Sequence, residues 1–317
     1  MRGAGLPLIR RLEGRLGKDR PTALTLLVDA PSLVYRALFS TPDSVRTPGG
    51  EPINAAHGFL NMLARLVADQ RPDRLACAED ADWRPAWRVD LVPTYKLHRT
   101  LPDSPAVAAE ERLKSQIPVL WKVLELCGVP VIGSPGFEAE DIIGTLAARA
   151  APPVAIFSGD RDLFQLVAGS QVRVLYPRRG TSDLICVDEP YIAAQYGIPP
   201  RAYADYAVLR GDASDGLPGV KGIGEKMAAA LVNRHGSLDA ILAAADAAGP
   251  AAPGPLGKVR RDRDYIERAR QVVRIRTDVP VPDVDLDRRA PAGDELWDLA
   301  REQGLTGGVT RLLEALA

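Results

Sequence analysis

The chain of 317 residues is 46% hydrophobic and 26% charged, and its length suits one large domain or two modest ones. It has no run of about 18 apolar residues, which excludes a membrane-spanning helix. The formal charge at pH 7 is −1, from 40 Lys and Arg against 41 Asp and Glu, and this balance by itself argues against a nucleic-acid-binding protein. Because the first twenty residues also lack the apolar segment of a secretory signal, we expect a soluble, cytoplasmic protein without membrane contact.

The cysteines and histidines are too scattered to build a site. Cys77, Cys127 and Cys186 stand about fifty residues apart without a C-x-x-C pair, so the sequence suggests neither a disulfide framework nor a thiolate zinc site. We expect reduced, buried thiols. The three histidines are far apart in the sequence, which argues against a histidine metal cage and a Ser-His-Asp triad.

The first half of the chain alternates strand and helix patterns. Short apolar runs at 23–29, 74–80 and 153–160 each end in an acid and predict buried parallel strands. Residues 54–69 and 115–127 have apolar spacing close to that of a helix. This alternation is typical of a parallel sheet flanked by helices, in which ligands collect beyond the carboxyl ends of the strands.

The second half is mainly helical. Alanine-rich segments at 225–234 and 237–247 predict helices, and residues 248–257 are dense in Pro, Gly and Ala, which predicts a loop or hinge. From about residue 279 the pattern indicates proline-spaced turns and then one final helix. The chain thus divides into a basic leader over 1–22, an α/β region over 23–199, a helical region over 200–290 and a tail helix within 291–317. The leader could be a disordered arm, a docking segment or a misassigned start.

Nine carboxylates are candidates for one site. Asp29, Asp80 and Asp160 end predicted strands, so a parallel sheet would place them at one edge. Glu138 and Asp141 lie three apart at the start of a predicted helix, on one face and near the positive end of the helix dipole. The full set is Asp29, Asp80, Glu138, Glu140, Asp141, Asp160, Asp162, Asp212 and Asp215.

Acids crowded at one edge repel each other unless cations neutralise them. Oxygen ligands without His or Cys suit Mg²⁺ or Mn²⁺, and two such ions can serve phosphodiester hydrolysis. Taking these nine from the 41 acids leaves 32 against 40 basic residues, a balance of +8 for the rest of the protein. The remainder therefore suits a polyanionic substrate. The alternative is that the acids are helix caps and solvated turns.

A glycine-rich hairpin, GLPGVKGIGEK over 216–226, precedes a predicted helix. Gly219, Gly222 and Gly224 let backbone N–H groups approach an anion, and Lys221 and Lys226 add positive charge. It departs from the P-loop and dinucleotide-binding patterns and looks like a helix-hairpin-helix element. The alternative is a tight turn between helices with incidental lysines.

A basic and aromatic segment follows Asp80. Bases can stack on its aromatic rings while its cations hold phosphates, although the tryptophans could equally be core residues. The residues concerned are Trp83, Arg84, Trp87, Arg88, Tyr95, Lys96 and Arg99.

Six elements in this order resemble the 5′-nuclease family of 5′–3′ exonucleases and flap endonucleases. They are VDA, a strand ending in Asp, YKLHR, GFEAEDIIGTLA, SGDRDLFQLV and GDASDGLPGVKGIGEKMAAALV. The likeness runs from about residue 24 to about residue 290 and is closest to the free-standing bacterial members. It implies a PIN-like α/β domain, a helical arch over about 81–118, and a helix-three-turn-helix DNA-binding region whose hairpin carries a potassium ion.

The resemblance also implies roles for the candidate residues. Lys96 and Arg99 match catalytic arch residues that contact the scissile phosphate, and Arg88 and Tyr95 match supporting positions on the DNA. Asp141 matches the second acid of the family's acidic pair. The first metal site would be Asp29, Asp80, Glu138 and Glu140, and the second Asp160, Asp162, Asp212 and Asp215.

Four positions depart from the family's pattern. Ala30 replaces a Gly, Glu79 an aromatic residue, Glu140 an Asp and Gly216 an Asn. Glu140 keeps its carboxylate but reaches one methylene farther, which puts metal spacing and preference in question.

The resemblance implies a nuclease that uses two or more Mg²⁺ or Mn²⁺ ions in DNA replication or repair. Its partners would be DNA with a 5′ flap, a nick or a 5′ end, with RNA primer strands as a further candidate. Two alternatives stay open: a structure-specific DNA-binding protein with weak or no cleavage, and a PIN-type ribonuclease, which the hairpin disfavours.

Overall fold

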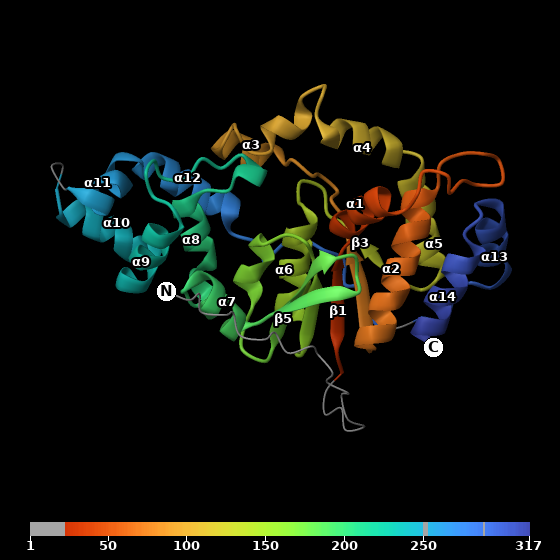
Figure 1. The fold of residues 1–317 in the computed structure, drawn as a ribbon. Helices are drawn as coiled ribbons and strands as arrows, with labels where there is room; N and C mark the ends of the chain where they lie inside the picture. The colour runs from red at the N-terminus through yellow and green to blue at the C-terminus, as the bar shows by residue number, and fades with distance from the viewer. Residues whose placement is uncertain (1–22, 250–252, 288) are drawn as a thin grey trace, which may run out of the picture.

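The computed structural model describes residues 23–249, 253–287 and 289–317. Its centre is a six-stranded sheet with the order β3-β2-β1-β4-β5-β6, in which only β6 is antiparallel to its neighbour. Figure 1 shows helices on both sides of this sheet and a group of helices beyond its β5 side. The strands are β1 Thr25–Asp29, β2 Arg74–Ala78, β3 Val131–Ile132, β4 Val154–Phe157, β5 Val172–Arg179 and β6 Asp183–Val187.

The central strands are buried on both faces. Leu26 and Val28 of β1 face one core, whereas Leu27 faces the other, as the alternation of side chains along a strand requires. The predicted parallel strands are confirmed, with one difference in length. Because β2 ends at Ala78 and β4 at Phe157, Asp80 and Asp160 lie on the loops beyond the strand ends.

Helices cover both faces of the sheet. The predicted helices over 54–69 and 115–127 are confirmed as α2 and α5, and Pro118 lies in the first turn of α5, where its missing N–H costs nothing. The helices of this region are α1 Ala30–Ser40, α2 Asn54–Gln70, α5 Gln116–Leu126, α6 Ala139–Arg149 and α7 Glu189–Tyr196, with the short η2 Asp162–Leu166.

The segment between β2 and α5 crosses above the carboxyl edge of the sheet (Figure 1). It contains α3 Ala86–Leu91, the 3-10 helix η1 Leu97–Thr100 and α4 Pro105–Leu113. The Ser104 hydroxyl accepts hydrogen bonds from the N–H groups of Ala106 and Val107 and so caps α4. We refer to residues 81–115 as the arch.

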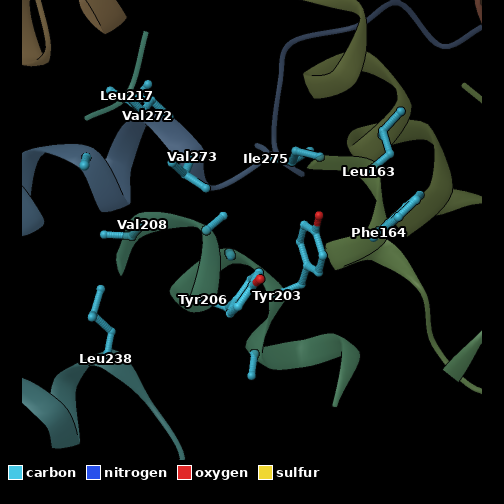
Figure 2. Packing of buried hydrophobic residues seen from close by; sticks show 14 of the residues in the cluster. Leu163, Phe164, Tyr203, Tyr206, Val208, Leu217, Leu238, Val272, Val273 and Ile275 are labelled. Carbon is cyan, nitrogen blue, oxygen red and sulfur yellow. The ribbon is translucent and has the colours of Figure 1, made fainter. Parts of the chain in front are cut away.

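The second region is helical, as predicted. Its helices are η3 Pro200–Ala202, α8 Tyr203–Arg210, η4 Ala213–Asp215, α9 Glu225–His235, α10 Leu238–Ala247, α11 Gly254–Arg261 and α12 Arg263–Val273. Figure 2 shows Tyr203 of α8, Phe164 of η2 and Val273 of α12 within one apolar core. This shared core joins the helical region to the sheet.

Two expectations for the second half are wrong. The predicted loop over 248–257 ends early, because α11 begins at Gly254 with Pro255 in its first turn, a position that suits proline. The tail holds two helices, α13 Gly293–Glu302 and α14 Thr306–Leu316, where one was predicted. Leu296 and Ala300 form the buried face of α13, but the acidic residues between and around them hide this apolar pattern in the sequence.

The cysteines are free, as expected, with Cys77 and Cys127 buried and Cys186 half-buried. The predictions for the leader 1–22 lie outside the described residues. No helix in the described ranges combines the length and apolar character needed to span a membrane.

Candidate functional site

Asp29 lies at the end of β1 and is 7% exposed. Its carboxylate accepts a hydrogen bond from the Ser32 N–H at 3.0 Å, which caps α1, and another from the Ser158 hydroxyl. Burial, followed by repulsion from Asp80 and Asp160, raises its pKa to about 7. Asp29 is therefore the N-cap of α1 and also a buried carboxylate whose negative charge is not balanced by a neighbouring cation among the causes of its pKa.

The next acids meet at the N-terminus of α6. The Asp80 carboxylate accepts the Ala139 N–H at 2.8 Å, which brings the β2 loop to this helix end. Burial raises the pKa of Asp80 to about 6, although the charge of Lys96 opposes the change. Glu138 precedes α6, and Glu140 and Asp141 lie in its first turn.

Arg88 sits among these acids with no exposed surface. Its guanidinium lies 2.6 Å from the Glu138 carboxylate, and 2.8 Å from those of Glu140 and Asp141. The Tyr95 hydroxyl donates to Glu138 at 2.6 Å. Arg88 and Tyr95, which were expected to contact DNA, are thus buried around the acids they hold.

The two proposed catalytic cations differ in exposure. The Lys96 side chain is 7% exposed and pairs with Glu138, whereas that of Arg99 is 34% exposed and lies 2.8 Å from the Asp215 carboxylate. The backbone N–H of Lys96 also donates a hydrogen bond to the backbone carbonyl of Asp215 at 2.9 Å. These contacts fasten the arch to η4.

The remaining acids come from two loops. Burial, and then repulsion from Asp160, Asp215 and Asp212, raises the pKa of Asp162 well above its ordinary value. Burial raises the pKa of Asp215 to about 6. Asp212 caps η4 through the Ser214 N–H at 2.8 Å and pairs with Arg210 at 2.9 Å.

The structure brings all nine predicted acids into one electrostatic group, which we call the acid cluster. Besides burial, repulsion from Asp80 and Asp160 raises the pKa of Asp29, and repulsion from Glu138, Asp141 and Asp160 raises that of Glu140. Burial and then repulsion from Asp160, Asp215 and Asp212 raise the pKa of Asp162. Sequence reasoning missed Ser158. Its hydroxyl donates a hydrogen bond to the Asp29 carboxylate and accepts one from the Asp160 N–H at 2.8 Å. Its place directly before GD in the SGDRD motif was the available signal.

The donor set of the acid cluster fits a hard divalent ion. All donors are carboxylate oxygens, and Asp141 Oδ2 is buried without a hydrogen-bond partner. As the side chains are placed, no three metal-binding residues within the described ranges enclose an ion position. Arg88, Lys96 and Arg99 occupy carboxylate oxygens instead, so the arch cations supply part of the neutralising charge.

The hairpin is fastened to α11 and α12 by side chains that sequence reasoning missed. The Gly219 N–H donates to the Tyr265 hydroxyl at 3.0 Å, and the Lys221 N–H donates to Asp262 at 2.9 Å. Lys258 donates to the Gly222 carbonyl at 2.8 Å. Because contacts this distant in sequence depend on helix packing, the hairpin motif alone could not predict them.

The remaining hairpin positions agree with a surface role. Lys221, Gly224 and Lys226 are exposed. Gly219 has φ of +69°, and a Cβ there would lie 2.5 Å from the Arg210 carbonyl oxygen.

The Gly216 departure also has a structural reason. Its φ is +70°, and a Cβ would lie 2.1 Å from the Thr94 carbonyl oxygen of the arch. The close approach of the arch to the hairpin therefore requires glycine at this position.

Solved structures share the whole fold. The T5 D15 protein co-crystallised with metal ions matches with a TM-score of 0.61 and 14% identity, covering 93% of this chain and 100% of that one. The catalytic core of Rad2 in complex with DNA substrate matches with a TM-score of 0.56 and 17% identity, covering 92% of each chain. At these identities the likeness establishes the fold.

Sequence relatives are closer. The 5'-3' exonuclease of Streptomyces coelicolor is 46% identical over 301 residues, covering 92% of this chain and 99% of that protein. The 5'-3' exonuclease of Mycobacterium tuberculosis is 42% identical over 308 residues, covering 92% and 97%. DNA polymerase I of the same bacterium is 38% identical over 263 residues, which cover 80% of this chain and 28% of the polymerase.

Two family models together span almost all of the described chain. The model described as "5'-3' exonuclease, N-terminal resolvase-like domain" matches residues 24–197. The model described as "5'-3' exonuclease, C-terminal SAM fold" matches residues 198–293. With the acid cluster, the arch and the hairpin in one fold, this chain belongs to the 5'-3' exonuclease family.

Proposed function

We propose that this protein is a divalent-metal-dependent 5′ nuclease that hydrolyses DNA phosphodiesters near junctions of single and double strand, in replication or repair. The observation that supports the proposal is the acid cluster, in which burial and repulsion between neighbouring carboxylates raise the pKa values of Asp29, Glu140 and Asp162. The relatives named 5'-3' exonuclease support it. Suitable substrates are 5′ flaps, nicks and 5′ ends, together with RNA primer strands.

Two or more Mg²⁺ or Mn²⁺ ions complete the proposed site. When bound, they polarise the phosphate and lower the pKa of water, which is the chemistry that phosphodiester hydrolysis needs. We assign Asp29, Asp80, Glu138 and Glu140 to the first ion. We assign Asp160, Asp162, Asp212 and Asp215 to the second.

The arch residues act around these acids. Lys96 and Arg99 can each leave a carboxylate for the scissile phosphate, and there they would stabilise the negative charge of the transition state. Arg88, Tyr95 and Asp141 act as positioning residues, because they contact Glu138 and Arg88 from buried positions.

The hairpin would hold the duplex. Its exposed Lys221 and Lys226 and the glycine backbone provide the sequence-independent phosphate contacts that such binding requires. We also propose that the hairpin loop binds a potassium ion through backbone carbonyl oxygens. Since the Lys221 and Gly222 carbonyls already accept hydrogen bonds from Arg261 and Lys258, the ion would use other carbonyls of the loop.

The working division of the chain is part of the same proposal. Residues 23–199 would carry the chemistry, 200–290 the duplex contacts, and 291–317 the closing tail.

Substituting one acid tests the activity. Asp160→Asn removes one charge from the acid cluster, so cleavage of a 5′-flap duplex should fall by about a thousandfold or more. Binding of the duplex in EDTA should change little. Gel-resolved cleavage with Mg²⁺, Mn²⁺ or EDTA and fluorescence anisotropy measure the two effects.

Asp283→Asn, at an exposed position in the 279–287 segment, is the matched control and should cleave normally. Undiminished cleavage by Asp160→Asn would contradict the assigned role. If the unchanged protein binds flaps but cuts neither flap, nick nor RNA with any metal, the alternative of a structure-specific DNA-binding protein holds. This alternative is supported by the ion pairs of Arg88 and Lys96 with Glu138, because they occupy carboxylate oxygens that a metal ion would need.

A further inference from the structure

A cavity of about 660 Å³ lies between β5, α7 and α9. None of the nine acids lines it. We propose that this cavity binds a nucleotide, with the base among its tyrosine rings and the phosphate at Arg161 and Lys226. This site goes beyond the proposed nuclease activity and shares only Lys226 with the proposed duplex contacts.

The walls of the cavity are aromatic. Tyr176, Tyr191 and Tyr196 are half-buried and line it. The Phe164 and Tyr176 rings meet edge to face with centroids 5.5 Å apart, and the Tyr196 and Tyr206 rings do so at 6.0 Å. Rings held in this way form a fixed platform whose exposed parts can stack on a base of any sequence.

Two cations at the cavity are available to a phosphate. Arg161 and Lys226 are exposed and line the cavity, and neither pairs with a carboxylate of the described residues. Arg161 and Tyr176 both line the cavity, which places the guanidinium among the aromatic side chains. Nearby Arg210, by contrast, is paired with Asp212 at 2.9 Å. Unpaired guanidinium and ammonium groups are preferred partners of phosphate oxygens.

Two amide side chains and the exposed carboxylate of Glu225, which lies 3.9 Å from the Arg210 guanidinium, complete the polar lining. Gln195 is exposed at the rim, and Asn233 donates one hydrogen bond to the Gly197 carbonyl, which leaves its side-chain oxygen free to accept from a base. Amides provide both donors and acceptors for base edges. Aromatic faces, two cations and two amides together match a base that carries a phosphate better than a simple anion or an apolar molecule.

The cavity touches both parts of the proposed nuclease. Arg161 stands between Asp160 and Asp162 in the sequence, and Lys226 follows the hairpin at the start of α9. The nucleotide could therefore come from the bound DNA strand or be a free mononucleotide. Both sources present the same chemistry, and competition separates them.

The test is a titration of the protein with dAMP in EDTA, in which calorimetry and tyrosine fluorescence measure binding. EDTA removes divalent ions, so the acid cluster cannot retain the phosphate through a metal. We expect saturable binding that Arg161→Gln, Lys226→Gln and Tyr196→Leu each weaken by about tenfold. Lys122→Gln, which removes an exposed cation of α5 outside the cavity and the hairpin, should bind dAMP normally.

Competition with a 5′-flap duplex in EDTA then identifies the source. Displacement of the duplex by dAMP assigns the cavity to a nucleotide of the strand, and binding of dAMP without displacement assigns it to a free nucleotide. Absence of dAMP binding, or equal affinity in Arg161→Gln and Lys226→Gln, would overturn the proposal. Loss of cleavage in the acid variants leaves these measurements unchanged, so the two proposals can fail separately.

Discussion

Arg88 shows how one buried side chain organises the acid cluster. Burial opposes its charge, but Glu140, Tyr95, Glu138 and Asp141 together raise its pKa. Three carboxylates this deeply buried would not remain ionised together without a counter-charge. Arg88 therefore replaces part of the charge that divalent ions supply elsewhere in the cluster.

Arg88→Met should lower the free energy of unfolding by about 3 to 5 kcal/mol, because it leaves buried carboxylates without their partner. Urea unfolding at neutral pH measures the loss. Arg112→Met is the matched control, since Arg112 pairs with Asp43 at the surface and its loss should cost less than about 1 kcal/mol. Similar losses in the two variants would show that Arg88 does not hold the acids.

At the scale of elements, the hairpin depends on α11 and α12 for its shape. Tyr265→Phe removes the acceptor of the Gly219 N–H. Affinity for a flap duplex should fall about fivefold, the equivalent of roughly 1 kcal/mol, because the loop loses its bound conformation. Fluorescence anisotropy in EDTA gives the affinity, and Gln271→Ala, exposed on the same helix, is the control. An unchanged affinity in Tyr265→Phe would mean that the hairpin is held by other contacts.

The packing of α6 gives a second prediction at this scale. Gly144 lies where the segment after α12 crosses α6, and a Cβ there would lie 2.4 Å from Ile275 Cγ2 and 2.5 Å from the Arg276 carbonyl oxygen. Gly144→Ala should therefore destabilise the protein by about 1 to 3 kcal/mol, although helix propensity alone favours alanine.

Gly293→Ala provides the comparison. Gly293 begins α13, and a Cβ there meets nothing within 4 Å. In thermal unfolding, the Tm of Gly144→Ala should be lower than that of the unchanged protein, whereas the Tm of Gly293→Ala should be equal or higher. A stabilised Gly144→Ala variant would show that the crossing segment moves aside at little cost.

At the scale of the whole molecule, the acid cluster ties stability to pH. Burial raises the pKa of Asp29 from 3.8 to about 7, and those of Asp80 and Asp215 to about 6. Over this range the folded protein holds protons that the unfolded chain releases. These groups therefore stabilise the fold at low pH, and their contribution disappears as the pH rises from about 4 to about 7.

The metal-free protein should thus lose unfolding free energy over this pH range more steeply than Asp29→Asn, which cannot titrate at that position. Mg²⁺ should reduce the loss, because a cation favours the ionised carboxylates. Urea unfolding at about pH 5 and about pH 7, in EDTA and in Mg²⁺, gives the four values needed. Equal slopes for the wild type and Asp29→Asn would contradict the raised pKa of Asp29.

The strands β1, β2 and β4, the helices α2, α5, α9 and α10, the order of the acid motifs and the glycine hairpin could be predicted from the sequence, whereas β3, β5, β6 and the individual arch helices were not predicted. The predicted features depend on short-range patterns, namely apolar period, strand-ending acids and glycine spacing. Because parallel strands end at one edge, the meeting of Asp29, Asp80 and Asp160 could also be predicted.

Which charges face each other depends on the packing of distant elements and could not be predicted from the sequence. The arch residues Arg88 and Tyr95 have the composition of a DNA-binding surface, yet they are buried against Glu138. The contacts of Tyr265 and Asp262 with the hairpin, and the cavity around Tyr196, join segments far apart in the chain. A pattern of residues cannot show which of its polar groups become desolvated, because that depends on packing between distant elements.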